Sequence, residues 1–162
     1  MRILVDSSTL IALSKIGELD VLKSLFERVF VTTAIKKEVL IGDFPETAVL
    51  KAAMNEWIEV MDYEGDAGEL RKYGLGLGEA SLLLAAKQED RLVLDETSAR
   101  RFAESRGFQF TGLIGLLIAA VRSRKLTKER AVEVLNRLAK SDFRISSDLY
   151  LWAYEEIGRV FP

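Results

Sequence analysis

Five short apolar runs divide this chain, and stretches with a helical spacing of apolar residues follow them. The runs cover residues 3–5, 29–31, 57–61, 91–94 and 108–110. Strands that alternate with helices pair in parallel through crossover connections, and the helices then cover both faces of the sheet. The pattern therefore predicts an α/β fold, a three-layer α/β/α sandwich around a mostly parallel central sheet.

The expected helices cover residues 7–16, 19–26, 47–54, 79–88, 97–106, 113–122, 128–139 and 147–157. One further helix carries Ile35, Glu38 and Val39, with Thr32 or Thr33 as its cap. Residues 62–77 are interpreted as a polar, glycine-containing connection. The length of 162 residues suits one compact domain. We therefore expect a single domain over residues 1–162, with a helical C-terminal extension from about residue 125.

The chain contains no cysteine and no histidine. Nucleophilic mechanisms that need an imidazole base are therefore excluded, and so are ordinary zinc sites. The remaining side-chain ligands for a metal are mainly carboxylate oxygens, which suit hard cations such as magnesium, manganese or calcium. Any catalytic metal in this protein should be a hard one.

No apolar stretch reaches the roughly 20 residues that a membrane helix needs. The first residues also lack the pattern of a secretory signal. We expect a cytoplasmic protein with no membrane partner.

Charge is uneven along the chain, because residues 96–130 carry eight basic and three acidic side chains, whereas residues 1–95 carry eleven basic and seventeen acidic ones. An acidic pocket beside a basic flank would explain this distribution.

Four acidic residues stand at positions where this fold places ligands. Asp6 and Asp95 follow two of the expected strands, Glu79 begins a helix, and Glu38 lies about one turn inside another. If the two strands are neighbours, about 4.8 Å apart, the two aspartates project side by side. Crowded carboxylates repel one another, and a bound cation is the simplest compensation. We expect the four carboxylates to face one cleft and to bind one metal site.

Each of these acids also has a simpler structural interpretation. Asp6 and Asp95 could be helix N-caps, since aspartate is a preferred capping residue. Glu38 could lie on a solvated helix face, and Glu79 could complement the dipole at a helix N-terminus. The run between Gly74 and Gly78 lacks the lysine of a phosphate-binding loop, and we interpret it as a hinge beside Glu79.

Four segments in order carry a resemblance to a known family: VDSSTLIAL, KKEVL, GLGEASLLLAA and RLVLDETSARRFA. They resemble the four acidic motifs of the PIN-domain family, and the similarity extends to about residue 120. The fold implied is VapC-like. The spacing from Asp95 to Arg100 and the tail KSDFRISSDLYLWA resemble a poorly characterised prokaryotic branch of that family. One departure is Val93, because many PIN domains have threonine two residues before the last aspartate.

The resemblance implies that Asp6, Glu38, Glu79 and Asp95 are metal-binding, catalytic acids, with Glu96 as a fifth candidate. Asp6 and Asp95 would ligate the metal directly, and the two glutamates would coordinate it through water or orient the attacking water. Ser8 is the small polar residue that follows the first acid, and it is a substrate-binding candidate. Arg100 and Arg101 are candidates for phosphate contacts, although charged residues on helices are usually only solvated.

The activity implied is a magnesium- or manganese-dependent endoribonuclease that hydrolyses phosphodiester bonds of single-stranded RNA. A role as the toxin of a toxin–antitoxin pair, with an antitoxin protein as partner, and a homodimeric state also follow from the resemblance. Two alternatives remain. A receiver-like or phosphatase-like domain is disfavoured because serines follow Asp6. A non-catalytic RNA- or protein-binding module that retains the PIN fold is disfavoured by the four acids.

Overall fold

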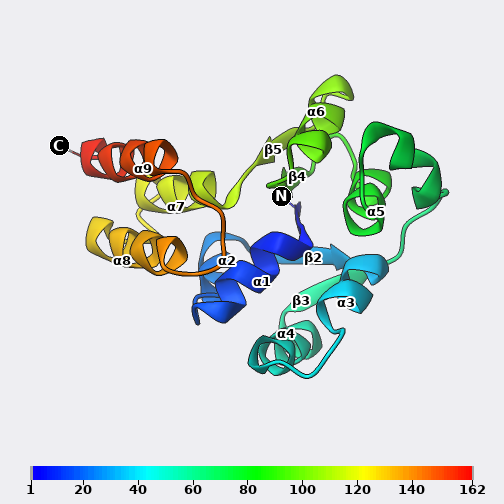
Figure 1. The fold of residues 1–162 in the computed structure, drawn as a ribbon, viewed down its shortest axis with the longest axis horizontal. Helices are drawn as coiled ribbons and strands as arrows, with labels where there is room; N and C mark the ends of the chain where they lie inside the picture. The colour runs from blue at the N-terminus through cyan, green and yellow to red at the C-terminus, as the bar shows by residue number, and fades with distance from the viewer. Residues whose placement is uncertain (1, 162) are drawn as a thin grey trace.

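The computed structural model describes residues 2–161 and contains a five-stranded sheet in which every neighbouring pair is parallel (Figure 1). The strands are β1 (Arg2–Val5), β2 (Arg28–Thr32), β3 (Ile58–Met61), β4 (Arg91–Val93) and β5 (Gln109–Thr111). Their order across the sheet is β3-β2-β1-β4-β5. The predicted parallel sheet is confirmed.

Helices connect and cover these strands. They are α1 (Ser7–Lys15), α2 (Asp20–Leu25), α3 (Thr33–Val39), α4 (Pro45–Glu56), α5 (Leu77–Ala85), α6 (Thr97–Ser105), α7 (Leu113–Arg122), α8 (Lys128–Ala139) and α9 (Ser147–Arg159). The sheet lies between α5 and α6 on one side and α1, α2 and α7 on the other (Figure 1). The three-layer α/β/α arrangement is therefore also confirmed.

Strand order reverses between β1 and β4. The chain proceeds from β1 outward to β2 and β3, and then returns to place β4 on the other side of β1 and β5 beyond it. The register pairs Val5 of β1 with Val93 of β4. In parallel sheets, such a reversal opens a crevice at the carboxyl ends of the strands, where ligands bind. Asp6 and Asp95 follow these two strands.

The connection from β3 to α5 differs from the sequence expectation. Residues 62–77 were expected to lack regular structure, but they contain a 3-10 helix, η1 (Ala67–Tyr73), which ends at Gly74 with φ at +79°. Helix α5 begins at Leu77, with Gly76 as its N-cap, and so starts earlier than expected. Glu79 is consequently the third residue of α5 rather than its first.

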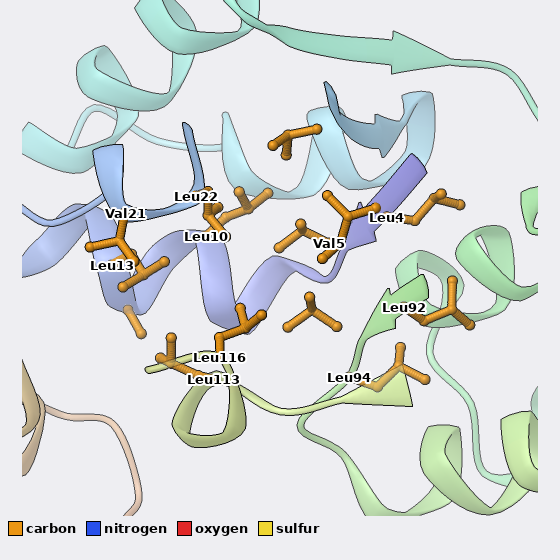
Figure 2. Close-up of a cluster of buried hydrophobic side chains, with 14 of the residues drawn as sticks. Leu4, Val5, Leu10, Leu13, Val21, Leu22, Leu92, Leu94, Leu113 and Leu116 are labelled. Carbon is orange, nitrogen blue, oxygen red and sulfur yellow. The ribbon is translucent and has the colours of Figure 1, made fainter. Parts of the chain in front are cut away.

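A hydrophobic cluster joins the sheet to the helices (Figure 2). It includes Leu4 and Val5 of β1, Leu10 of α1, and Leu113 and Leu116 of α7. These side chains are almost fully buried, and burial of a leucine contributes roughly 1.5–3 kcal/mol. Because apolar contacts hold α1 and α7 against β1, the loops after β1 and β4 lie on a rigid base.

The last three helices, α7, α8 and α9, pack against one another. Glu18, which is 4% exposed, pairs with Arg130 and Arg137 of α8 at 2.5 and 3.0 Å. Lys15 at the end of α1 pairs with Asp142 in the segment between α8 and α9, which passes beside α1 (Figure 1). Two sets of ion pairs thus connect the C-terminal helices to the sheet domain.

Among residues 2–161, no helix has both the length and the apolar character needed to cross a membrane.

Candidate active site

Asp6 is the most buried member of the acidic group, with 3% of its surface exposed. It caps α1, because its Oδ1 accepts the backbone N–H of Thr9 at 3.1 Å. Its Oδ2 accepts the backbone N–H of Asp95 at 2.9 Å and the hydroxyl of Ser8 at 3.2 Å. The N-cap interpretation of Asp6 is therefore right, and the same carboxylate also connects β1 to the loop after β4.

Asp95 lies beside Asp6 but is not the N-cap of α6, since Glu96 occupies that position. Its Oδ2 accepts the hydroxyl of Thr9 at 2.8 Å, and its Oδ1 accepts the backbone N–H of Leu113 at 3.3 Å. Arg100 approaches the same Oδ1 to 3.7 Å. These contacts fix the direction of the Asp95 side chain from three different elements.

The two aspartates form an electrostatically costly pair. Burial, together with the neighbouring charge of Asp95, raises the pKa of Asp6 to about 6, although the hydrogen bonds from Thr9 and Asp95 act in the opposite direction. Within residues 2–161, no lysine or arginine forms an ion pair with Asp6. A hard cation bound here would offset both the burial and the repulsion.

Glu79 and Glu38 belong to a second, more exposed group. Glu79 is half-buried, and its Oε2 accepts the backbone N–H of Gly76, the N-cap residue of α5, at 3.1 Å. Burial raises the pKa of Glu79, and the charges of Glu96 and Glu38 add to this effect, although the Gly76 hydrogen bond opposes it. Glu38 and Glu96 therefore lie close enough to Glu79 to repel its carboxylate.

The carboxylate of Glu38 lies against Gly78, where a Cβ atom would collide with its Oε2. The same Cβ atom would also lie 3.3 Å from Ile35 and 3.4 Å from the hydroxyl of Ser7. Glycine at position 78 thus allows α3, α5 and the start of α1 to approach closely. The sequence alone indicated a glycine-rich connection here but not this contact.

The structure divides the four acids between two adjoining cavities. Asp6, Glu38 and Glu79 line one of about 580 Å³, which we call the glutamate cavity. Asp95 lines another of about 720 Å³. Ser8 and Glu96 line both. The expectation was one shared cleft, whereas the acids line two cavities that meet at Ser8 and Glu96, and Thr9, Leu113 and Arg100 orient the Asp95 side chain.

The candidate phosphate-binding residues have different surroundings. Arg100 is partly buried, and its Nε donates to the backbone carbonyl of Leu94 at 2.7 Å. It lines the cavity that contains Asp95. Arg101 is exposed and lines neither cavity.

The residue that sequence reasoning missed is Thr9, which contacts both aspartates. Its position three residues after a capping aspartate was the available signal.

The donor set suits magnesium or manganese, because every candidate ligand is a carboxylate oxygen. Over the described range, however, no three carboxylates are already arranged to hold one ion. Asp6 and Asp95 are positioned by backbone and threonine donors, whereas Glu38 has no hydrogen bond in the same range. The residues therefore fit a hard cation, provided that the glutamates turn toward the aspartates.

The protein is an α/β protein in which two carboxylates lie at the carboxyl edge of a parallel sheet, where the strand order reverses. Sheets of this kind bind ligands at that edge. A family model described as a PIN domain matches residues 2–159. The chain belongs to the PIN-domain family, whose fold is of the nuclease type. Searches of curated proteins and of solved structures found no match.

Proposed function

We propose that this protein is a metal-dependent endoribonuclease that hydrolyses phosphodiester bonds of single-stranded RNA. The observation that carries the proposal is the buried Asp6 carboxylate, which lies beside Asp95 at the reversal of a PIN-type sheet and has no basic partner within residues 2–161. Such an arrangement destabilises the metal-free protein, as functional sites commonly do. Its simplest use is to bind a divalent cation.

In this proposal, Asp6 and Asp95 hold the ion, and Glu38 and Glu79 turn toward it or orient the attacking water. A bound magnesium or manganese ion would polarise the phosphodiester and favour formation of hydroxide from water at neutral pH. Thr9 keeps the Asp95 carboxylate in place through its hydroxyl. Ser8 lies at the boundary of the two cavities and is suited to contact substrate.

The test is cleavage of an end-labelled single-stranded RNA by the wild type and by Asp6→Asn, with magnesium, manganese or EDTA. A matched control is Asp66→Asn, because Asp66 also accepts a backbone N–H at a helix start but lies on the exposed surface of η1. We expect cleavage by the wild type and the control only when metal is present. EDTA-resistant cleavage by purified Asp6→Asn would refute the metal mechanism.

The second candidate is a non-catalytic binding module that keeps the PIN fold. It is favoured by one observation, that no three carboxylates in the described residues are preassembled around an ion site. Manganese distinguishes the two functions without an activity assay. Under the ribonuclease proposal, manganese raises the melting temperature of the wild type but not that of Asp6→Asn. A binding module shows neither this shift nor cleavage.

The proposed partners are single-stranded RNA, a second copy of the chain and, if the protein is a toxin, an antitoxin. The cytoplasm is the proposed place of action because it contains the proposed substrate. Exposed apolar side chains support a protein partner, since Ile41, which lines the glutamate cavity, is 72% exposed and Phe44 is 59% exposed. Sedimentation velocity of the purified protein tests the homodimer.

A further inference from the structure

The cavity that contains Asp95 also has an aromatic wall, and we call it the aromatic cavity. Trp152 and Leu149 of α9 and Phe143 of the preceding segment line it. Trp152 is 49% exposed, although tryptophan usually buries most of its surface. A flat, partly exposed indole is a surface on which a nucleic acid base can stack.

Three basic side chains line the same cavity, and they differ in their contacts. Lys15 pairs with Asp142, and Arg100 contacts Asp95 and the Leu94 carbonyl. Arg144 is exposed and makes no hydrogen bond or ion pair with any part of the chain from residue 2 to residue 161. Its guanidinium is therefore free to bind a phosphate, for which its planar donors are well suited.

The aromatic cavity brings acidic and basic side chains together. Asp95 and Glu96 line it along with Arg144 and Trp152, and Ser8 and Glu96 also line the glutamate cavity. A nucleic acid bound in the aromatic cavity would therefore lie beside the carboxylates that bind metal in the proposed function.

We propose that the aromatic cavity binds a nucleotide adjacent to the scissile phosphate, with its base stacked on Trp152 and its phosphate bound by Arg144. The inference rests on the proposed function, because it takes single-stranded RNA as the ligand. It assigns substrate binding to α9 and the segment before it. RNA is a better fit than a protein segment because an arginine that pairs with none of the described residues and an exposed indole occur together beside the carboxylates.

Binding is measured without cleavage by fluorescence anisotropy of labelled hexauridine and hexaadenosine in EDTA, at several salt concentrations. Trp152→Ala should weaken binding roughly tenfold, as expected for loss of one base–aromatic stack. The control Leu151→Ala removes a neighbouring side chain of α9 that is 55% exposed and does not line the cavity, and it should bind like wild type. Melting curves confirm that both variants fold.

Arg144→Gln tests the phosphate contact separately. Loss of one phosphate contact should lower the slope of log affinity against log salt by about 1, for both oligonucleotides alike. The control is Lys51→Gln, because Lys51 is exposed on α4 and lines neither cavity. An unchanged salt slope in Arg144→Gln would remove the phosphate contact from the proposal.

Tryptophan fluorescence reports on the stack directly, because the chain contains only Trp57 and Trp152. In a Trp57→Phe protein, Trp152 is the sole tryptophan, and the oligonucleotides should quench its emission with the affinity found by anisotropy. Quenching that does not saturate, or that has a different midpoint, would show that the base lies elsewhere.

The outcomes separate this inference from the ribonuclease proposal. If Trp152→Ala weakens binding but the wild type does not cleave RNA with metal, the subsite stands and the catalytic proposal fails. If the wild type cleaves RNA and Trp152→Ala binds equally well, the subsite is refuted and the catalysis stands. Loss of self-association in Trp152→Ala, with unchanged RNA affinity, would refute the subsite and assign this surface to a second copy.

Discussion

The two aspartates and the two principal glutamates of this site are held in different ways. Asp6 accepts two backbone N–H groups, and Asp95 accepts one backbone N–H and one threonine hydroxyl. Glu79 accepts a single backbone N–H, and Glu38 is exposed and has no hydrogen bond within the described residues. The aspartates are therefore held by more hydrogen bonds than the glutamates, and Glu38 is the least constrained of the four.

This difference follows from where each acid lies in the sheet. Asp6 and Asp95 follow neighbouring strands whose register is fixed by the ladder, so the backbone N–H of Asp95 reaches the carboxylate of Asp6. Glu38 and Glu79 lie on helices whose approach depends on Gly78. Under the proposed function, the two aspartates would bind the cation first and the two glutamates would turn toward it afterwards.

The largest expected effect concerns catalysis. Asp6→Asn or Asp95→Asn should lower kcat by about a thousandfold, since direct metal contacts contribute several kcal/mol of transition-state stabilisation. Glu38→Gln or Glu79→Gln should lower it only about 10–100-fold, as is usual for groups that act through other ligands. Steady-state cleavage of one labelled RNA under saturating manganese measures all four variants. Equal losses for aspartates and glutamates would contradict the distinction between the two pairs.

The second prediction uses pH and the metal-free protein. The pKa of Asp6 is about 6 in the folded state, against 3.8 as its ordinary value, so the folded state binds more protons between these two pH values. The Asp6 contribution to stability is therefore present below about pH 4 and is lost as pH rises through about 6. The loss amounts to at most about 3 kcal/mol.

Other acids titrate in the same range, so the difference between wild type and Asp6→Asn isolates this contribution. Urea unfolding in EDTA at several pH values should show the wild type losing stability relative to the variant as pH rises from 4 to about 6. If the difference in the free energy of unfolding between wild type and Asp6→Asn does not change with pH, ionisation of Asp6 does not destabilise the folded protein.

The sequence predicted the fold better than it predicted the site. Apolar periodicity and caps are local signals, and the expected bounds of α7 and α8 agree with the structure, where Thr127 caps α8. The 3-10 helix η1 was missed because a short segment with glycine at both ends has no clear apolar period. The sequence pattern therefore predicted a helix correctly where the helix buries apolar residues at a regular spacing.

The site depends on contacts between distant residues, which a single sequence does not reveal. The placement of Asp6 and Asp95 at strand ends could be inferred, because each lies directly after an apolar run. The orientation of Asp95 could not, since it depends on Thr9, 86 positions away, and on Leu113. The separation into two cavities and the exposed Trp152 are likewise products of tertiary packing.

The third prediction compares two buried or nearly buried aspartates in the metal-free protein. Asp95→Asn should raise stability by about 1 kcal/mol, because it removes repulsion with Asp6, and an amide can still donate to Thr9 and accept from Leu113. Asp90→Asn should lower stability. Burial acts to raise the pKa of Asp90, but the ion pair with Arg2 lowers it overall.

Thermal melts of both variants in EDTA, at pH 7, measure this contrast. A stability gain of this size raises the melting temperature by roughly 2–4 °C in a protein of this length. A marked loss in Asp95→Asn would show that the Asp95 carboxylate is a structural element of the loop after β4 rather than a strained ligand.

The smallest expected effect tests the mobility of the glutamates. Gly78→Ala places a methyl group against the Glu38 carboxylate, and an exposed carboxylate can rotate away at little cost. Contact with the buried Ile35 opposes the gain in helix propensity, so the change in stability should stay within about 1 kcal/mol. Manganese affinity, measured by calorimetry, should fall by less than about tenfold. Gly76→Ala is the control, since its Cβ atom would lie 3.9 Å from Glu79 and meet ordinary packing. If Gly78→Ala instead abolished manganese binding, the Glu38 carboxylate could not move aside without loss of the metal site. Glu38 would then be as fixed as the aspartates, and the distinction between the two pairs of acids would fail.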